Sequence, residues 1–227
     1  MTAEDWFIDW VSPARFDRYL RAAGHDRDRA RRLYEWNARL SGAFLHDLSH
    51  LEIGLRNAYD RALQGAVVRG EAHWTEPRTA TALFPVDVRH HRNGGTARDV
   101  NAIARRRIAE AVDRARTPDH AQPLPGKVVA ELTFGFWTML TSDRLERTVW
   151  RPYLHLAYES GTRRDGVRDA LEDLRRFRNR VAHHECILDR PEPHLRRLLS
   201  QVRRIAPEAA ADLRARSGVP ALLERRP

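Results

Sequence analysis

The chain has 227 residues, of which 40 are lysine or arginine and 31 are aspartate or glutamate, so its formal net charge is +9. Because Lys127 is the only lysine, arginine carries nearly all of the positive charge, as a GC-rich genome would produce or a polyanionic partner such as nucleic acid would favour. Cys186 is the only cysteine, which excludes a disulfide within the chain and a zinc site built from several cysteines.

The N-terminal stretch MTAEDWFIDW is acidic and aromatic, and it lacks the basic region and apolar run of a secretory signal peptide. The longest apolar stretch, residues 128–140, contains Glu131 and is shorter than the roughly 20 residues that a membrane-spanning helix needs. We therefore expect a cytoplasmic protein that does not associate with membranes.

Helix signals dominate the first part of the chain. Ser12 followed by a proline is a typical helix start and Gly24 a typical helix end, which predicts a helix between them. Asp26 can cap a second helix over 27–67, in which apolar residues recur every three or four positions. This helix would be roughly 60 Å long if unbroken. We therefore expect a bend near Ser41–Gly42 and a central position in a bundle.

The middle of the chain is less regular. Residues 71–95 contain two prolines and the stretch HHRNGG without a regular period, which predicts a long loop with a role in function. Helices are predicted over 96–116 and 126–140, and a short segment begins at Ser142.

The last part of the chain predicts three further helices, namely one that begins at Asp165, a basic one over 194–205 and a peripheral tail over 207–227. No segment has the strict alternation of a strand. The predicted fold is therefore a single all-α domain covering residues 1–227, with peripheral helices around a helical bundle.

The helix that begins at Asp165 contains the stretch LRRFRNRVAHHECI. When it is plotted at about 100° per residue, its apolar residues share one face. Asn179 and His183 fall on nearly the opposite face, and Arg178 lies between the two. His183 is thus predicted to face water or a partner surface. His184 lies nearer the apolar side, where we expect a structural role or a supporting role in a site.

An arginine and a histidine together suit the cleavage of RNA. Histidine titrates near neutral pH, so it can take a proton from a ribose 2′-OH or give one to the leaving oxygen. Arginine can bind the phosphate and stabilise its developing charge. Because the 2′-OH is the nucleophile, no metal is needed and DNA is not a substrate. In so arginine-rich a chain, however, such spacings occur about as often as chance predicts, so spacing alone does not select Arg178 and His183.

Three blocks of sequence supply the wider context. They are LYEWNARLSGAFLHDLSHLEIGLRNAYDRAL (33–63), ELTFGFWTML (131–140) and FRNRVAHHE (177–185). In this order and spacing they resemble the Abi (abortive infection) family of bacterial phage-defence proteins, and the third resembles the R-N-x-x-x-H motif of the HEPN superfamily. The resemblance covers residues 12–206 and implies a HEPN-like helical bundle.

The resemblance also implies a function. Arg178 and His183 match the catalytic pair of the motif, and Asn179 matches the polar residue after the arginine. Many HEPN proteins are dimeric, metal-independent ribonucleases, which implies a homodimeric toxin that cleaves RNA without a cofactor. An antitoxin or a regulatory RNA would be a further partner. The arginines around the motif are expected to bind RNA (Arg175, Arg176 and Arg180).

Two other pairs are candidates for the site. Glu52 and Arg56 are four residues apart on the long helix, where the simpler interpretation is an ion pair in or near the core. The alternative is that one of them borders the catalytic cleft and orients the catalytic pair. His46 and His50 have a spacing that can bind zinc, but no third ligand is evident nearby, so we predict no metal site.

The sequence leaves alternative functions open. A non-catalytic RNA-binding or scaffolding helical protein would show the same arginine content and the same helices. A structural dimer in which the motif only packs is a third interpretation. The 2′,3′-cyclic phosphate ends that 2′-OH attack produces would distinguish a ribonuclease from both.

Overall fold

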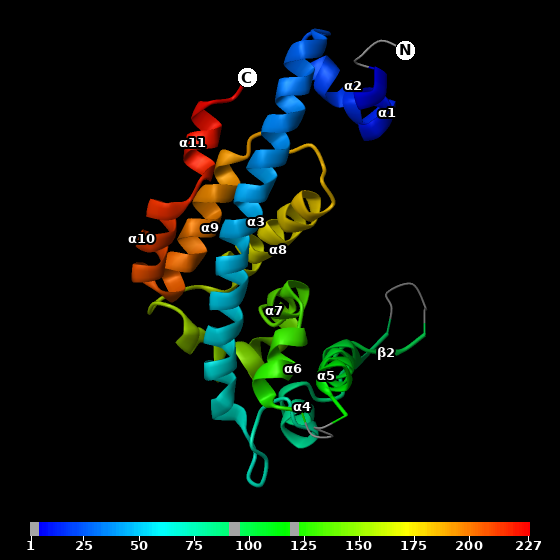
Figure 1. The fold of residues 1–227 in the computed structure, drawn as a ribbon. Helices are drawn as coiled ribbons and strands as arrows, with labels where there is room; N and C mark the ends of the chain where they lie inside the picture. The colour runs from blue at the N-terminus through cyan, green and yellow to red at the C-terminus, as the bar shows by residue number, and fades with distance from the viewer. Residues whose placement is uncertain (1–4, 91–95, 119–122) are drawn as a thin grey trace.

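The structure is a computed structural model that describes residues 5–90, 96–118 and 123–227 (Figure 1). Within these ranges nearly all regular structure is helical. The strands are β1 (Val88–Arg89) and β2 (Arg98–Asp99), which pair antiparallel with Val88 opposite Asp99. The all-α prediction is confirmed.

The long helix α3 (Arg27–Leu63) runs through the middle of the molecule (Figure 1). Asp26 caps it, because its Oδ1 accepts a hydrogen bond from the backbone N–H of Arg29 at 2.9 Å. The helix continues through Ser41 and Gly42 without interruption, where we had expected a bend. Other helices contact α3 along its length, and this packing supports an unbroken helix of about 55 Å.

The remaining helices surround α3. On one side of it in Figure 1 lie α9 (Glu192–Ile205), α10 (Pro207–Arg216) and α11 (Val219–Glu224), and on the other lie α7 (Phe134–Met139) and α8 (Arg164–Ala182). Near its N-terminal end lie α1 (Asp5–Val11) and α2 (Pro13–Ala22). As predicted, the Ser12 side chain caps α2, and Gly24 follows it with a positive φ of 65°.

The segment 71–95 differs from the predicted loop. It contains α4 (Pro77–Leu83) and β1, in addition to residues 91–95, which lie outside the described ranges. The carboxylate of Glu71 accepts hydrogen bonds from the backbone N–H groups of Arg78 and Thr79, at 2.8 and 2.7 Å. Glu71, six residues before Pro77, thus supplies acceptors for the free N–H groups in the first turn of α4. The next helix, α5 (Ala102–Ala115), begins later than predicted because β2 occupies part of its expected range.

The helix predicted over 126–140 is divided in two. α6 (Pro125–Glu131) ends before Leu132, and α7 begins after Thr133. The indole N–H of Trp137 donates to the carbonyl of Leu132 at 3.2 Å and so satisfies a group that the break removes from helical bonding. Short 3-10 or π segments complete the chain: η1 (Gln64–Ala66), η2 (Asp143–Leu145), η3 (Glu146–Trp150) and η4 (Leu154–Ala157).

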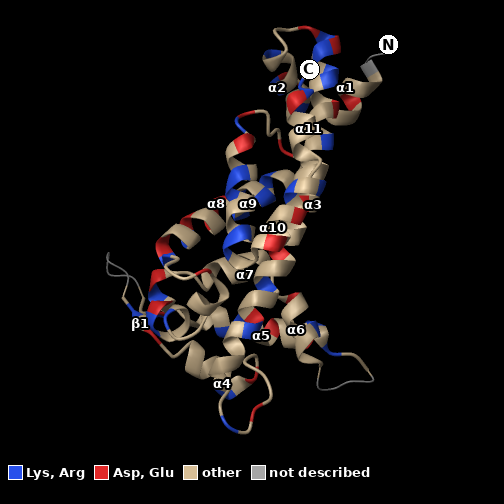
Figure 2. Ribbon diagram, turned by 90° about the vertical axis from the view of Figure 1, so that its left-hand side faces the viewer, with Lys and Arg blue, Asp and Glu red and all other residues tan. Residues whose placement is uncertain are grey.

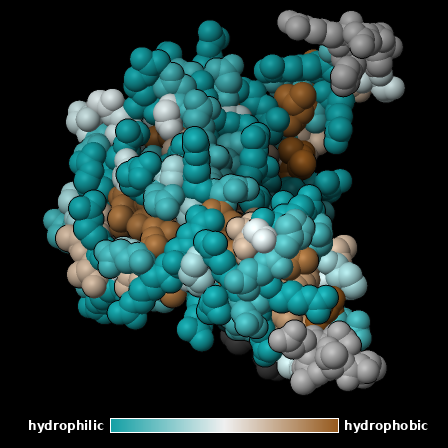
Figure 3. All heavy atoms as spheres, turned by 90° about the horizontal axis from the view of Figure 1, so that it is seen from above, coloured by the Kyte–Doolittle hydropathy of each residue, from teal (hydrophilic) through white to brown (hydrophobic). Residues whose placement is uncertain are grey.

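The buried face of α8 contacts α3 as its periodicity predicted. All six apolar residues of that face are buried, and the rings of Phe177 and Phe44 meet edge to face at 4.8 Å. The face seen from above is mostly hydrophilic, with smaller apolar patches between the polar side chains (Figure 3). Among the described residues, none of the helices combines the length and apolar character needed to cross a membrane.

The C-terminal segment 207–227 is helical, as predicted, and it also contributes to the core. Ala210, Leu213 and Val219 are buried. The indole N–H of Trp36 donates to the carbonyl of Leu222 at 2.6 Å, which fixes α11 to α3. The segment is therefore joined to the bundle by both apolar and polar contacts.

Candidate functional site

α8 ends in a Schellman motif that carries both histidines. The backbone N–H of Glu185 donates to the carbonyl of Arg180 at 2.9 Å, and that of His184 donates to the carbonyl of Val181 at 3.0 Å. His183 is the capping residue at which the regular helix stops. His184 follows with a φ of 55°, in the left-handed position that glycine usually fills.

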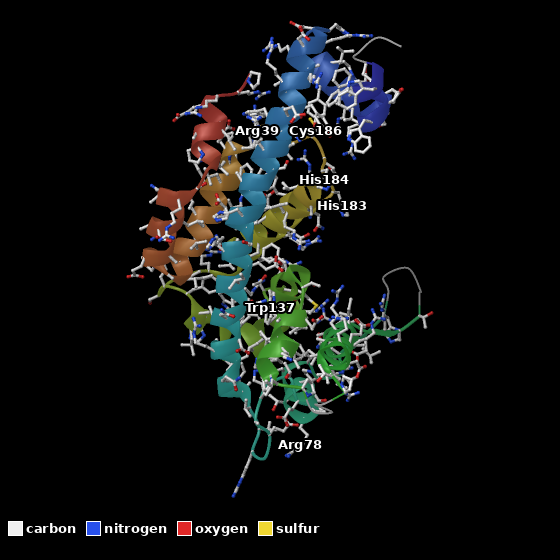
Figure 4. All side chains as sticks on the ribbon, viewed as in Figure 1. Arg39, Arg78, Trp137, His183, His184 and Cys186 are labelled. Carbon is white, nitrogen blue, oxygen red and sulfur yellow. The ribbon has the colours of Figure 1, made fainter. Side chains whose placement is uncertain are left out.

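This helix end corrects the prediction for His184. We had placed it nearer the apolar side by continuing the helical spacing, but the left-handed turn redirects the chain and leaves its side chain exposed. His183 is exposed, as predicted. Figure 4 shows both histidines at the C-terminal end of α8.

The segment after α8 is fixed to its surroundings by hydrogen bonds to its backbone. Asn37, which is only 4% exposed, accepts from the N–H of Ile187 at 2.8 Å and donates to the carbonyl of Glu185 at 3.4 Å. Arg15 donates to the carbonyl of His184 at 3.3 Å, and Arg226 donates to that of Leu188 at 3.1 Å. Contacts from α2, α3 and the C-terminal end thus hold the backbone of His184 and of the segment that follows it in place.

Sequence reasoning did not find this role of Asn37. The available signal was its position, because a polar residue that shares the buried face of a long helix needs a specific hydrogen-bond partner. Its neighbours Leu33, Trp36 and Leu40 are all buried. The partner, however, is about 150 residues away in the chain.

Arg178 lies beside Glu52 of α3. Its Nη2 is 3.9 Å from Glu52 Oε2, and the two side chains are 41% and 25% exposed. The expected pair between Glu52 and Arg56 is not formed, and Arg56 Nε is buried without a hydrogen-bond partner among the described residues. Glu52 therefore lies at ion-pair distance from Arg178 without a hydrogen bond between them, and its role in orienting the catalytic pair stays a prediction.

By ideal helix geometry, Arg178 and His183 leave α8 in different directions. They are about 140° apart around the helix axis. Arg178 reaches toward Glu52 of α3, whereas His183 is the residue that caps the end of α8. Asn179 lies on the His183 side, and its carbonyl accepts the backbone N–H of His183 at 2.9 Å.

The three arginines expected to bind RNA all have protein partners. Arg175 forms two hydrogen bonds with Glu172, at 2.9 and 2.7 Å, and Arg176 forms a third at 3.3 Å. Arg180 pairs with Glu185 and donates to the carbonyl of Cys186 at 2.7 Å. The bond from Arg175 lowers the pKa of the Glu172 carboxyl, so this carboxylate stays charged. An RNA phosphate would have to displace these partners.

His194 was not singled out from the sequence. Its ring stacks on Phe177, with centroids 3.9 Å apart and an angle of 9° between the planes, and its Nδ1 is 3.1 Å from Asp173 Oδ2. Burial lowers the pKa of His194, although Asp173 opposes the shift. A half-buried histidine that is stacked in this way supports the packing of α8 on α9.

The histidine pair on α3 does not have the surroundings of a metal site. The rings of His46 and His50 are 4.8 Å apart, and His46 Nδ1 is 3.0 Å from Asp47 Oδ1. Asp47 also accepts from Ser217 at 2.5 Å. In the described part of the chain, no three histidine, cysteine, aspartate or glutamate residues are grouped so that they could hold a metal ion.

A pocket of about 690 Å³ lies elsewhere, between α4, α5 and α6. Its lining is mainly apolar, with Glu76, Arg105 and Asp113 among its polar residues, and it contains none of the predicted site residues. The end of α8 is therefore the place where the predicted site residues gather.

Comparisons with known proteins add no assignment. No protein-family model, curated protein or solved structure gives a significant match to this chain.

Proposed function

We propose that the chain is a metal-independent endoribonuclease of the HEPN type, which acts in the cytoplasm as an abortive-infection toxin. The observation that carries the proposal is the end of α8, where an exposed His183 sits on a fixed turn and follows Arg178 by five residues. Catalysis depends on holding such groups within a fraction of an ångström. The contacts from Asn37 and Arg15 supply that restraint on the backbone.

In the proposed reaction, the 2′-oxygen of the ribose attacks the adjacent phosphorus. His183 accepts the 2′-OH proton, and the bond from phosphorus to the 5′-oxygen breaks. The 5′-oxygen takes up a proton, which leaves a 2′,3′-cyclic phosphate and a 5′-hydroxyl. Arg178 stabilises the charge on the non-bridging oxygens, and Glu52 orients its guanidinium. Asn179 would bind the substrate as a neutral polar group.

The divergence of Arg178 and His183 favours a two-fold homodimer in this proposal. Around one helix axis the two side chains are about 140° apart. In a two-fold dimer, Arg178 of one protomer and His183 of the other can face the same phosphate, and the symmetry produces two such sites. The charge of Glu172, Glu185 or bound RNA would offset the repulsion between the two arginine-rich surfaces.

The first experiment measures cleavage of total RNA and the chemistry of the product ends. We expect wild-type protein to leave 2′,3′-cyclic phosphates, and we expect His183→Ala and Arg178→Ala to be inactive. His155→Ala and Arg216→Ala are matched controls, because both residues are exposed and lie outside the proposed site. Full activity of both site variants would contradict the assignment. RNA binding without cleavage by the wild type would instead support the non-catalytic alternative.

Chelation tests the independence from metal. Because the proposed reaction uses only the ribose hydroxyl and protein side chains, cleavage should continue at an unchanged rate in EDTA. A loss of cleavage that zinc or magnesium reverses would overturn the mechanism and direct attention to His46 and His50.

Mixing two inactive variants tests the composite site. If each site takes Arg178 from one protomer and His183 from the other, a heterodimer of Arg178→Ala and His183→Ala keeps one intact site and regains activity. If both residues come from one protomer, the mixture stays inactive. Full activity from a strictly monomeric protein, as judged by light scattering, would rule out the dimeric site.

A further inference from the structure

A second basic region lies near the other end of α8. A pocket of about 370 Å³ is formed by β2, the start of α5 and η2. Its polar lining includes Arg98, Arg106 and Arg144, and its apolar lining includes Val100 and Ile103. Figure 2 shows basic residues both on α8 and at β1, which lie on the same side of the molecule in this view.

Two arginines of this pocket, Arg98 and Arg144, and Arg168 beside it differ from the arginines at the C-terminal end of α8, because they lack carboxylate partners among the described residues. The third arginine of the lining, Arg106, pairs with Glu110 at 3.5 Å. In the described part of the chain, Arg98, Arg144 and Arg168 form no ion pair. Arg144 Nε is buried and has no hydrogen-bond partner there, and Arg168 reaches the carbonyl of Thr138 only at 3.5 Å. An unpaired, partly buried guanidinium is costly unless a ligand completes its hydrogen bonds.

Like charges gather around Arg144. Burial lowers its pKa, and the nearby charges of Arg168 and Arg89 add to the effect, while the charge of Asp87 opposes it. The acidic residues nearby are engaged elsewhere: Asp87 with Arg89, Asp99 with Arg105, and Asp143 with Arg164. The ion pairs of the described residues therefore leave Arg98, Arg144 and Arg168 without a carboxylate partner of their own.

We infer that this pocket, through Arg98 and Arg144 of its lining and Arg168 beside it, is a cleft that binds the phosphate backbone of RNA and anchors the strand whose cleavage takes place at His183. The choice of RNA as ligand rests on the proposed function. Guanidinium groups suit this ligand because they donate paired hydrogen bonds to phosphate oxygens.

The geometry of α8 connects the two sites. Arg168 and His183 are 15 residues apart, which corresponds to about 22 Å along the helix and about 60° around it. Arg175 and Asn179 lie between them on the same face. At 3.4 Å per nucleotide, this distance corresponds to roughly six stacked nucleotides. The cleft would therefore hold RNA several nucleotides away from the bond that is cut.

The test measures RNA binding in a protein that cannot cut. The full-length His183→Ala protein is titrated against a labelled single-stranded RNA of roughly 12 nucleotides, long enough to reach both sites. Adding Arg144→Gln and Arg168→Gln should weaken binding at least tenfold. It should also lower the slope of log affinity against log salt by about 1.4, since each lost phosphate contact on a single strand contributes about 0.7.

A matched control removes the same charge elsewhere. Arg203 and Arg216 lie on α9 and α10 and are paired with Glu159 and Asp212. Replacing both with Gln should change RNA affinity by less than about twofold, because these pairs are exposed and not part of the cleft. If the two double variants weaken RNA binding equally, the effect is one of general charge and the inference is overturned. It is also overturned if neither double variant weakens RNA binding.

Two further arms make the outcome decisive. Circular dichroism checks that the double variant Arg144→Gln with Arg168→Gln folds. If it does not, the single variant Arg98→Gln tests the cleft instead, because Arg98 is exposed. A threefold or larger loss of RNA affinity would support the cleft, and no loss would overturn it.

Tripolyphosphate tests a free anion as the ligand: if it binds the cleft while the variants keep full RNA affinity, the inference fails. Absence of cleavage by the wild type would defeat the proposed function without affecting this binding test.

Discussion

The two ends of α8 are held in different ways. At its C-terminal end a Schellman motif, the amide of Asn37 and the guanidinium of Arg15 fix the backbone, and the nearby arginines are paired with glutamates. At its N-terminal end the capping residue is Arg163, whose side chain makes no capping hydrogen bond. Arg168, one turn further on, has no carboxylate partner among the described residues.

This contrast distinguishes what catalysis requires of an arginine from what polyanion binding requires. The number of arginines alone does not distinguish the two. Chemistry needs groups held in place, so the restrained end suits catalysis. Binding a polyanion needs charge that the protein has not already neutralised. In this chain, the pairing of each arginine is therefore more informative than the number of arginines in a stretch.

The largest expected effect concerns the apolar face that both ends share. Phe177 is 2% exposed and contacts Phe44 and His194. Phe177→Ala should lower the free energy of unfolding by about 3–5 kcal/mol, because it removes a buried aromatic ring and leaves a cavity. His183→Ala, at an exposed position, should stay within about 0.5 kcal/mol. Urea denaturation measures both, and equal stabilities would refute the burial of this face.

The next effect concerns the restraint at the C-terminal end. Asn37→Ala removes the partner of the Ile187 N–H, which should cost about 1–3 kcal/mol for a buried unsatisfied group. It should also speed hydrogen exchange at the Ile187 amide and reduce RNA cleavage. Asn57→Ala is the control, since Asn57 is exposed on the same helix. Unchanged protection of Ile187 would mean that Asn37 does not hold this segment.

His184→Gly tests the left-handed turn. Glycine adopts a φ of 55° without the steric cost that histidine has there, so the variant should be more stable by up to about 1 kcal/mol. His183→Gly is the neighbouring control. His183 has a φ of −89°, so glycine there gains nothing and should be neutral or slightly destabilising. If both variants lose stability equally in thermal melts, the Schellman motif is not formed.

The smallest expected effect concerns the uncapped N-terminal end. Arg163 has an extended backbone, with φ −87° and ψ 133°, as a capping residue requires. Asp165 already accepts from the first-turn N–H of Gly166 at 2.9 Å, so Arg163→Ser would add a second acceptor, at the capping position itself, and should raise stability by about 0.5–1 kcal/mol. The exposed pair between Arg163 and Asp165 is lost, which costs little. Arg163→Ala removes the same pair without adding a cap, so a similar melting temperature for the two variants would contradict the prediction.

The elements that sequence reasoning predicted well are those with local signals. Ser12, Asp26 and Gly24 mark helix ends through their own side chains or backbone, and the apolar face of α8 follows from its spacing. Between residues 71 and 140 the deciding contacts are less local. Glu71 satisfies α4 from outside it, and the indole of Trp137 bonds across the break before α7.

The candidate site shows the same limit. The exposure of His183 and the burial of Phe177 follow from helical periodicity. The contact between Glu52 and Arg178, and the role of Asn37, depend on how α3 and α8 pack together. His184 was misplaced because α8 ends at Ala182, two residues before it, so helical spacing does not extend to His184. Hydrogen bonds within the Schellman motif set the left-handed turn there.

The hydrogen bond from Arg226 to Leu188 has a consequence for the order of events during synthesis. Arg226 lies 38 residues beyond Leu188, and its guanidinium also lies over the ring of Trp36, with 5.4 Å to the ring centroid. At roughly 5–20 residues per second, a ribosome adds those residues in roughly two to eight seconds. For that interval both histidines have been translated, but the segment that follows them lacks one of its supports. If the chain has the proposed activity, the hydrogen bond from Arg226 that supports its site would therefore form only after this delay.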